Sequence, residues 1–367
     1  MHSPLVLPSN IDTLRQDFRN HVEQRLGDEW LQVFPHAQDK SGFPSFTPAL
    51  HPLVYGGKRM RAWGVALGFI LARTALPNTW DQGLLDLACA VELFQSAALV
   101  HDDVIDRADT RRNSPSAHRV YETLCDPPSE QFGQAAAIVA GDFLLSCAYR
   151  CVHRSALGIP QTQSQAVFRL FDAMSAEVAF GQFIDMWAEK LPLSKETPPA
   201  LDSALTVVES KSAHYSAMYP LLLGAGFAGE SWDENSTLGS FGRHVGIAFQ
   251  LRDDELGVYG DPEVTGKPAG DDIREGKRTV LLAHTWAQAN PAQQDTLSSL
   301  WGQADLSESQ VDHIRTIIID TGAQAALETQ ITQHSTQALG LIPQLSPERA
   351  IQELLEDYVH ALTDRQY

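Results

Sequence analysis

The chain has 367 residues, of which 43% are hydrophobic, and it carries a formal net charge of −19 at pH 7. A chain of this length can bury a large core, so its folding does not require a structural metal or disulfides. Its acidity argues against nucleic-acid binding, because proteins that bind nucleic acids concentrate positive charge at the contact surface.

The N-terminal residues lack a basic segment followed by an apolar one, so we expect no secretory signal. No run of about eighteen consecutive apolar residues occurs, so we expect neither a spanning helix nor a membrane anchor. The cysteines, which include no CxxC pair, are Cys89, Cys125, Cys147 and Cys151. We interpret them as reduced core residues, which predicts a cytoplasmic protein.

Helical patterns dominate the chain. Stretches with little or no glycine and proline predict helices at 84–100, 135–152, 164–180, 201–219, 240–251 and 347–362. The proline- and glycine-containing segments between them, 43–57, 190–199 and 260–276, are typical of helix connections. No alternating pattern predicts a strand, and no repeat of solenoid length occurs. The sequence therefore predicts one all-α domain over residues 1–367, with about a dozen helices.

The first chemical motif is DDVID at 102–106, at the end of the predicted helix 84–100. Asp102 and Asp106 lie four residues apart, so their carboxylates share one helix face. Like charges repel at that spacing, and the negative end of the helix dipole adds to the repulsion. A bound cation removes this conflict, and ligand sets made only of oxygen suit Mg²⁺.

A second acidic pair, Asp253-Asp254, ends the predicted helix 240–251. Two acidic clusters that each end an apolar helix predict two walls of one cavity. Mg²⁺ in proteins usually binds one or two carboxylates together with phosphate oxygens and waters. We therefore expect this cavity to receive a phosphorylated substrate.

Basic residues accompany both acidic clusters. The segment GGKRMR at 56–61 joins a glycine pair to three cations at the start of a helix, where backbone N–H groups favour anions. Arg111-Arg112 follows the first acidic cluster, and the segments 266–268 and 275–278 follow the second. Arginine offers a planar fork that matches phosphate oxygens. Such clusters in an acidic protein indicate phosphate binding.

These motifs together resemble those of the trans-isoprenyl diphosphate synthases, the polyprenyl synthetase family. The resemblance runs from about Tyr55 to Lys277, leaving residues 281–367 as C-terminal helices. Its motifs, in order, are GGKRMR at 56–61, HDDVID with RR at 101–112, AGDFLL at 140–145, GQFID at 181–185, KSA at 211–213, FQLRDD at 249–254 and GKPAGDDIREGK at 266–277. It implies an all-α bundle around a central cavity, a homodimer, and condensation of isopentenyl diphosphate with an allylic diphosphate (dimethylallyl, geranyl or farnesyl).

The resemblance also implies roles for individual residues. The residues expected to hold metal are Asp102, Asp106 and Asp253. The expected metal is three Mg²⁺ ions, with Mn²⁺ as a possible substitute. Those expected to grip the allylic diphosphate are Arg111, Lys211 and Lys267. Those expected to bind isopentenyl diphosphate are Lys58, Arg61, Gln95 and Arg112. Those expected to place polar oxygens near the allylic cation are Ser212 and Gln250, and the expected site is completed by Asp103, Asp254 and Lys277.

Some positions depart from the family pattern. Gly257 stands where many relatives have the third aspartate of the second motif. Because Asp253 is the principal ligand implied there, we expect activity to survive with weaker binding of the third metal. Asn113 replaces a common glycine, Gln95 replaces a common histidine, and Ser212 replaces the usual threonine.

Product length is expected to follow the depth of the cavity beneath Asp102. One helical turn is about 5.4 Å long, close to the length of an isoprene unit. Ala97 and Ala98 lie five and four residues before Asp102, where the resemblance implies that bulky aromatics stop growth at farnesyl diphosphate. Phe94, one turn deeper, is a candidate floor, although it would equally suit an ordinary core. The alanines predict geranylgeranyl diphosphate (C20), with farnesyl diphosphate (C15) as the alternative.

Other functions remain open at this point. A class I terpene cyclase shares the fold, the first aspartate motif and Mg²⁺, but GGKRMR and Arg112 favour elongation, and no Asn-x-x-x-Ser-x-x-x-Glu string follows the second helix. A non-catalytic partner subunit of a prenyl synthase usually loses aspartates of the first motif, which are intact here. Elongation by ionisation, condensation and elimination needs no side-chain nucleophile, which is consistent with the absence of a Ser/His/Asp or Cys/His constellation from the sequence.

Overall fold

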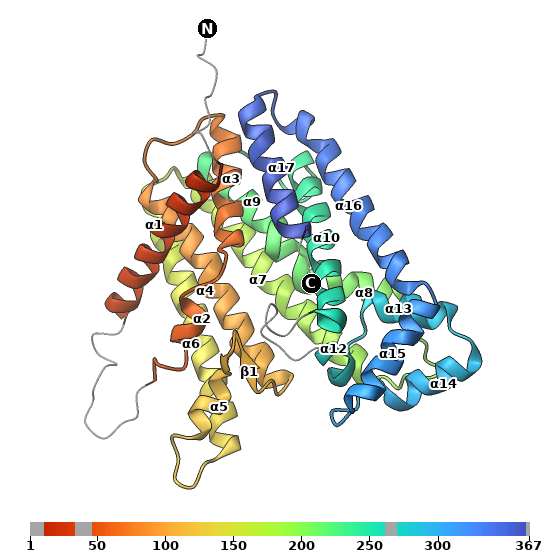
Figure 1. Ribbon diagram of the computed structural model, residues 1–367. Helices are drawn as coiled ribbons and strands as arrows, with labels where there is room; N and C mark the ends of the chain where they lie inside the picture. The colour runs from red at the N-terminus through yellow and green to blue at the C-terminus, as the bar shows by residue number, and fades with distance from the viewer. Residues whose placement is uncertain (1–10, 34–45, 261–269, 365–367) are drawn as a thin grey trace. The chain divides into compact units, whose positions relative to one another are not determined.

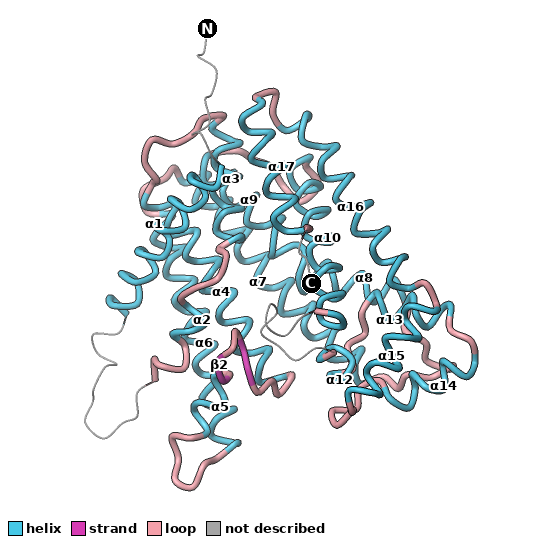
Figure 2. The backbone as a smooth tube through the Cα atoms, viewed as in Figure 1, coloured by secondary structure: helices cyan, strands magenta, loops and turns pink. Residues whose placement is uncertain are grey.

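The computed structural model of the protein describes residues 11–33, 46–260 and 270–364 (Figure 1). Its helices are α1 (Ile11–Val33), α2 (His51–Val54), α3 (Met60–Arg73), α4 (Gln82–Ile105), α5 (Ala117–Glu122), α6 (Glu130–Ala156), α7 (Gln161–Lys190), α8 (Leu201–Val207), the π-helix η1 (Val208–Met218), α9 (Tyr219–Ala228), α10 (Thr237–Tyr259), α12 (Asp271–Glu275), α13 (Val280–Gln288), α14 (Pro291–Leu300), α15 (Glu308–Asp320), α16 (Ala323–Leu345) and α17 (Arg349–Thr363). The predicted all-α class is confirmed, as the predominance of helix in Figure 2 shows.

The helices form two compact units. The first contains the chain up to residue 171 together with residues 220–232 and 348–354. The second contains residues 172–219 and 233–347 together with the chain from residue 355 onward.

Helix α4 is the central element of the first unit. It packs against α1, α2, α3, α5 and α6, and most of its side chains are buried. Asp81 caps its start, because the Asp81 carboxylate accepts the backbone N–H groups of Gly83 at 2.8 Å and Leu84 at 3.2 Å. Such a cap stabilises a helix by about 1 kcal/mol.

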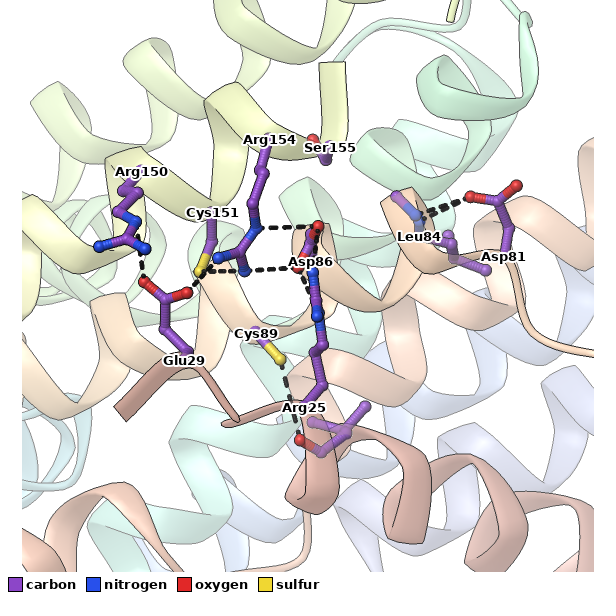
Figure 3. Close-up of polar contacts among 12 residues, drawn as sticks. Arg25, Glu29, Asp81, Leu84, Asp86, Cys89, Arg150, Cys151, Arg154 and Ser155 are labelled. Carbon is purple, nitrogen blue, oxygen red and sulfur yellow. Dashed lines mark hydrogen bonds and ion pairs between the residues drawn. The ribbon is translucent and has the colours of Figure 1, made fainter. Parts of the chain in front are cut away.

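Three carboxylates are buried along α4: Asp86, Glu92 and Asp103, with 3%, 6% and 0% of each residue exposed. Each is paired with arginine. At Asp86 the partners are Arg25 of α1 and Arg154 of α6, and Arg154 also pairs with Glu29 of α1 (Figure 3). A buried carboxylate needs such a partner, because an isolated buried charge is strongly unfavourable.

The second unit is built around α10. This helix packs against η1 and α16, and its inner face joins a core supplied by α13, α15 and α16. Gly246 and Gly242 lie directly against the backbone of η1, at Ala213 and Met218, where any Cβ would overlap main-chain atoms. The two glycines therefore let η1 approach α10 closely.

A short β-hairpin is the one departure from helical structure among the described residues, and the sequence did not predict it. It pairs β1 (Thr110–Arg111) with β2 (Ser114–Pro115). The turn residues Arg112 and Asn113 both have positive φ, 52° and 59°. Two-residue hairpin loops require this left-handed backbone, and asparagine adopts it more readily than most residues. Asn113 can thus stand where glycine is common.

The stretch 201–219, predicted as one helix, contains α8 and then the wider π-helix η1. Its helical character is confirmed, but hydrophobic periodicity does not separate the two winding modes. By length and composition alone, α4 and α6 could also cross a membrane. In α4, however, 78% of the apolar stretch is buried inside the protein, as in a core helix. The expected absence of a spanning helix stays a prediction.

Candidate active site

The first acidic motif forms the C-terminal end of α4. Asp102 and Asp106 are both half-buried, and Asp106 ends the helix, with its N–H donating to the carbonyl oxygen of Asp102 at 2.8 Å. Their two carboxylates, four residues apart, offer the oxygen donors that Mg²⁺ prefers. The predicted metal-binding residues of this motif therefore fit the ion.

Asp103 differs from Asp102 and Asp106 in its burial and its partner. Its side chain is fully buried, and its Oδ1 accepts a hydrogen bond from Nε of Arg111 at 2.7 Å. Nη2 of Arg111 lies 3.3 Å from Oδ2 of Asp102. Burial of the guanidinium lowers the pKa of Arg111, but the charges of Asp103 and Asp102 outweigh burial and raise that pKa above its ordinary value. Arg111 is thus a fixed cation beside the acidic motif, and Asp103 is the residue that holds it.

A basic surface lies beside α4 in the same unit. Gly56 and Gly57 have φ of 88° and 89°, and a Cβ placed on Gly57 would lie 3.5 Å from Nη2 of Arg112. Arg112 Nη1 donates to the carbonyl oxygens of Pro52 and Leu53, at 3.2 Å each. At Gly57 the loop therefore lies closely over the Arg112 guanidinium.

The charge of this surface favours an anion. Burial lowers the pKa of Arg112, and the nearby charges of Arg59, Arg111 and Arg61 lower it further. Cations that destabilise one another in this way gain from a bound diphosphate. Lys58 is exposed on the same loop, and Gln95 lies in the neighbouring part of α4.

In the second unit, η1 carries Lys211 and Ser212, both half-buried. Lys211 Nζ donates to Asp185 Oδ2 of α7 at 2.5 Å. Gly181 lets the two elements approach, because any Cβ there would overlap the backbone at Ser210 and Lys211. Sequence reasoning noted the GQFID motif but gave Asp185 no role. The structure shows that Asp185 fixes the position of Lys211.

The second acidic motif lies near the end of α10. Asp253 is exposed, whereas Asp254 is buried and accepts Nε2 of Gln250 at 2.8 Å. Burial raises the pKa of Asp254 well above its ordinary value, and the negative charge of Asp272 adds to the rise. Gln250 thus orients Asp254, while its expected role near an allylic cation stays a prediction.

Position 257, where the third aspartate is absent, has another carboxylate close against it. The Asp272 carboxylate of α12 lies against Gly257, so any side chain at 257 would overlap it. Lys277 lies beside the same group, with its Nζ 3.4 Å from Asp272 and 2.8 Å from Glu275. Lys277 is therefore engaged with carboxylates. The predicted Lys267 lies outside the described residues.

The residues predicted to set product length belong to the first unit. Ala97 and Phe94 are buried in α4, and Ala98 is half-buried. The Phe94 ring packs edge-on against Phe171 with 5.9 Å between centroids, and Phe171 packs edge-on against Tyr149 at 5.1 Å. Phe94 is thus one member of an aromatic cluster formed by α4, α6 and α7.

Comparison with known proteins agrees with these features. Residues 44–318 match the polyprenyl synthetase family. The chain is 32% identical over 316 residues to a (2E,6E)-farnesyl diphosphate synthase of Mycobacterium tuberculosis, covering 84% of this chain and 80% of that protein. It is 30% identical to a geranylfarnesyl diphosphate synthase of Aeropyrum pernix, covering 86% and 96%.

A similar solved structure is a geranylgeranyl pyrophosphate synthase of Corynebacterium glutamicum, complexed with isoprenyl diphosphate and magnesium. It is 32% identical, with a TM-score of 0.85 over 97% of this chain and 100% of that one. The chain therefore belongs to the polyprenyl synthetase family, has the isoprenoid synthase fold, and is a prenyl diphosphate synthase that condenses isopentenyl diphosphate.

Proposed function

We propose that this enzyme extends an allylic diphosphate to geranylgeranyl diphosphate, the C20 product. The observation that carries the proposal is the order of side chains along α4, where Ala97 and Ala98 lie one turn before Asp102 and the aromatic Phe94 follows one turn deeper. Identity to relatives does not decide the product, because relatives near 30% identity are named for farnesyl and geranylfarnesyl products.

The described residues support a division of labour in this reaction. Asp102, Asp106 and Asp253 would hold Mg²⁺, which when bound neutralises negative charge on the leaving diphosphate. In the first unit Arg111 is fixed by Asp103, and in the second Lys211 is fixed by Asp185. Each would offer a held cation to diphosphate oxygens of the allylic substrate. Fixed cations need little reorganisation as negative charge develops on the leaving group.

The test is to incubate the purified protein with isopentenyl diphosphate, Mg²⁺ and each allylic primer (C5, C10, C15), and to size the products. A dominant C20 product supports the proposal. A C15 product places the floor nearer to Asp102, and a longer product removes Phe94 from that role. No elongation by folded protein alone would favour a terpene cyclase or a partner subunit.

A variant examines the floor directly. Phe94→Ala removes the ring that packs on Phe171, so we expect products longer than C20. The matched control is Phe18→Ala, which removes another buried ring, one that packs on Trp80 in the same unit. The control should lower stability without lengthening the product. Unchanged product length in Phe94→Ala, or equal lengthening in both variants, would remove Phe94 as the floor.

We also propose a cytoplasmic homodimer made of single-domain subunits. Exposed apolar side chains support an interface within each unit: Phe132, Ile138 and Val139 on α6, and Phe180, Phe183 and Trp187 on α7. Such side chains at helical spacing favour a partner surface.

All cysteines are free thiols, which suits a reducing compartment. The family match spans parts of both units, which supports one domain. Light scattering of Val139→Glu, expected to be monomeric, tests the dimer.

A further inference from the structure

One cation of the GGKRMR loop is turned into the protein. Arg59 is only 4% exposed, whereas Lys58 beside it is exposed. Arg59 Nε lies 2.8 Å from Glu23 of α1, Nη1 lies 3.0 Å from Glu92 of α4, and Nη2 donates to the carbonyl oxygen of Val54 at 2.5 Å. Arg59 is thus satisfied by the protein itself and is not placed to contact substrate.

Glu92 holds the loop in a second way. While its Oε2 pairs with Arg59, its Oε1 accepts the backbone N–H of Ala62 at 3.0 Å, in the first turn of α3. Arg59 has a left-handed backbone, with φ of 56°. This strained conformation persists because contacts on both sides of the residue fix it. The middle of α4 therefore fixes both Arg59 and the start of α3.

The same part of α4 also fixes Arg112. Ser96, one turn after Glu92, donates to the carbonyl oxygen of Leu53 at 2.8 Å. That carbonyl oxygen also accepts Nη1 of Arg112 at 3.2 Å, and Gly57 of the loop lies over the Arg112 guanidinium. Loop 56–61 and Arg112, the two sides of the basic surface, are thus both held by one stretch of α4. This stretch also carries Gln95.

A buried ion pair is weak evidence of a stabilising role, because loss of hydration offsets much of the attraction between the charges. What the Arg59–Glu92 pair supplies is geometry. We propose that Arg59 and Glu92 are positioning residues for isopentenyl diphosphate, which hold loop 56–61 on α4 so that Lys58 and Arg61 stay beside Arg112. The inference rests on the proposed binding of that substrate by Lys58, Arg61, Gln95 and Arg112.

The test is the variant Glu92→Gln, which keeps the side chain's shape and an acceptor for Ala62 but removes the charge that holds Arg59. We expect KM for isopentenyl diphosphate to rise by about ten- to a hundredfold, the range seen when a residue that orients a ligand-binding group is replaced. KM for the allylic primer should change by less than about threefold, within the effect of a weak contact. Calorimetric titration of isopentenyl diphosphate should show the same loss of affinity.

The matched control is Asp86→Asn, which breaks the other arginine pairing between α1 and α4 (Figure 3). It should lower stability but leave KM for isopentenyl diphosphate unchanged. Equal changes in the KM of both substrates in Glu92→Gln, or equal effects of both variants on isopentenyl diphosphate, would overturn the inference. Should Glu92→Gln fail to fold, Glu23→Gln removes only the more exposed partner, and the same KM should rise by a smaller factor.

Two further variants separate this inference from the assigned binding site. Lys58→Ala and Arg112→Ala should each raise KM for isopentenyl diphosphate. If they do and Glu92→Gln does not, the positioning role alone is wrong. If neither does, the assignment of the substrate to this surface is wrong.

Discussion

Two arginine–carboxylate networks join α1 to α4, and they differ in what surrounds them. The Asp86 network uses residues that all lie within three helices, and the Asp86 carboxylate accepts hydrogen bonds from both Nε and Nη2 of Arg25, at 2.7 and 3.0 Å (Figure 3). The Glu92 network uses Arg59, a residue of a loop whose neighbours are implied substrate ligands. Both are buried and both satisfy their charges. Burial and charge alone therefore do not identify a functional residue, whereas the contacts around it do.

The third buried acid of α4 extends the same comparison. Asp103 also pairs with an arginine, Arg111, but it adjoins Asp102 of the first acidic motif. From Asp86 through Glu92 to Asp103, the buried acids lie progressively closer in sequence to the C-terminal end of α4, where the acidic motif begins. We expect the effect of substitution to change from stability alone to substrate binding along this order.

The largest expected effect on stability is at Asp86. Asp86→Asn leaves Arg25 and Arg154 without their shared carboxylate, and breaking a buried ion pair lowers the free energy of unfolding by about 3–5 kcal/mol. Urea unfolding measures the loss. The control Asp295→Asn breaks an exposed pair with Lys195 and should lower that free energy by less than about 1 kcal/mol. A loss at Asp86 no greater than at Asp295 would break the contrast between buried and exposed pairs.

A second test concerns the place where Asp272 lies against Gly257. Gly257→Ala puts a methyl group into the space of the Asp272 carboxylate, so we expect the free energy of unfolding to fall by about 1–3 kcal/mol. The control is Gly340→Ala in α16, where nothing lies within 4 Å of the new methyl group. Alanine there should stabilise the helix by up to about 1 kcal/mol. If the free energy of unfolding falls in Gly257→Ala and rises in Gly340→Ala, the tight Gly257–Asp272 contact is supported. A change of the same sign in both variants contradicts it.

The sequence predicted the parts of the site that are local in the chain. Helix periodicity placed Asp102 and Asp106 at the end of α4, and motif order identified the basic loop. It did not reveal that Asp103 is buried against Arg111, or that Arg59 and Lys58 point in opposite directions. Asp103 meets Arg111 only because the chain turns back after α4, and Arg59 is held inward by Glu92, which lies far from it in sequence. Neither periodicity nor composition encodes these contacts.

The smallest expected effect concerns a pair without a counter-ion of its own. In the second unit, Nδ1 of His244 on α10 lies 2.9 Å from Nδ1 of His334 on α16, with Arg243 and Glu209 nearby. Burial, together with the adjacent His244 and Arg243, lowers the pKa of His334 to about 4. This pair differs from the arginine networks because protonation of both rings would place two cations in contact.

Because the folded state lowers this pKa, the unfolded chain binds the proton more tightly. The stabilising contribution of the neutral pair is fully present above the unfolded pKa of about 6.5 and is lost as pH falls toward 4. Between pH 7 and pH 5 we expect a loss on the order of 1 kcal/mol, since partial exposure screens the effect. His334→Gln cannot take up the proton and should flatten the pH dependence of urea unfolding over this range. If the variant and the original protein lose stability in parallel, other groups carry the acid sensitivity, and the contact between α10 and α16 is indifferent to protonation.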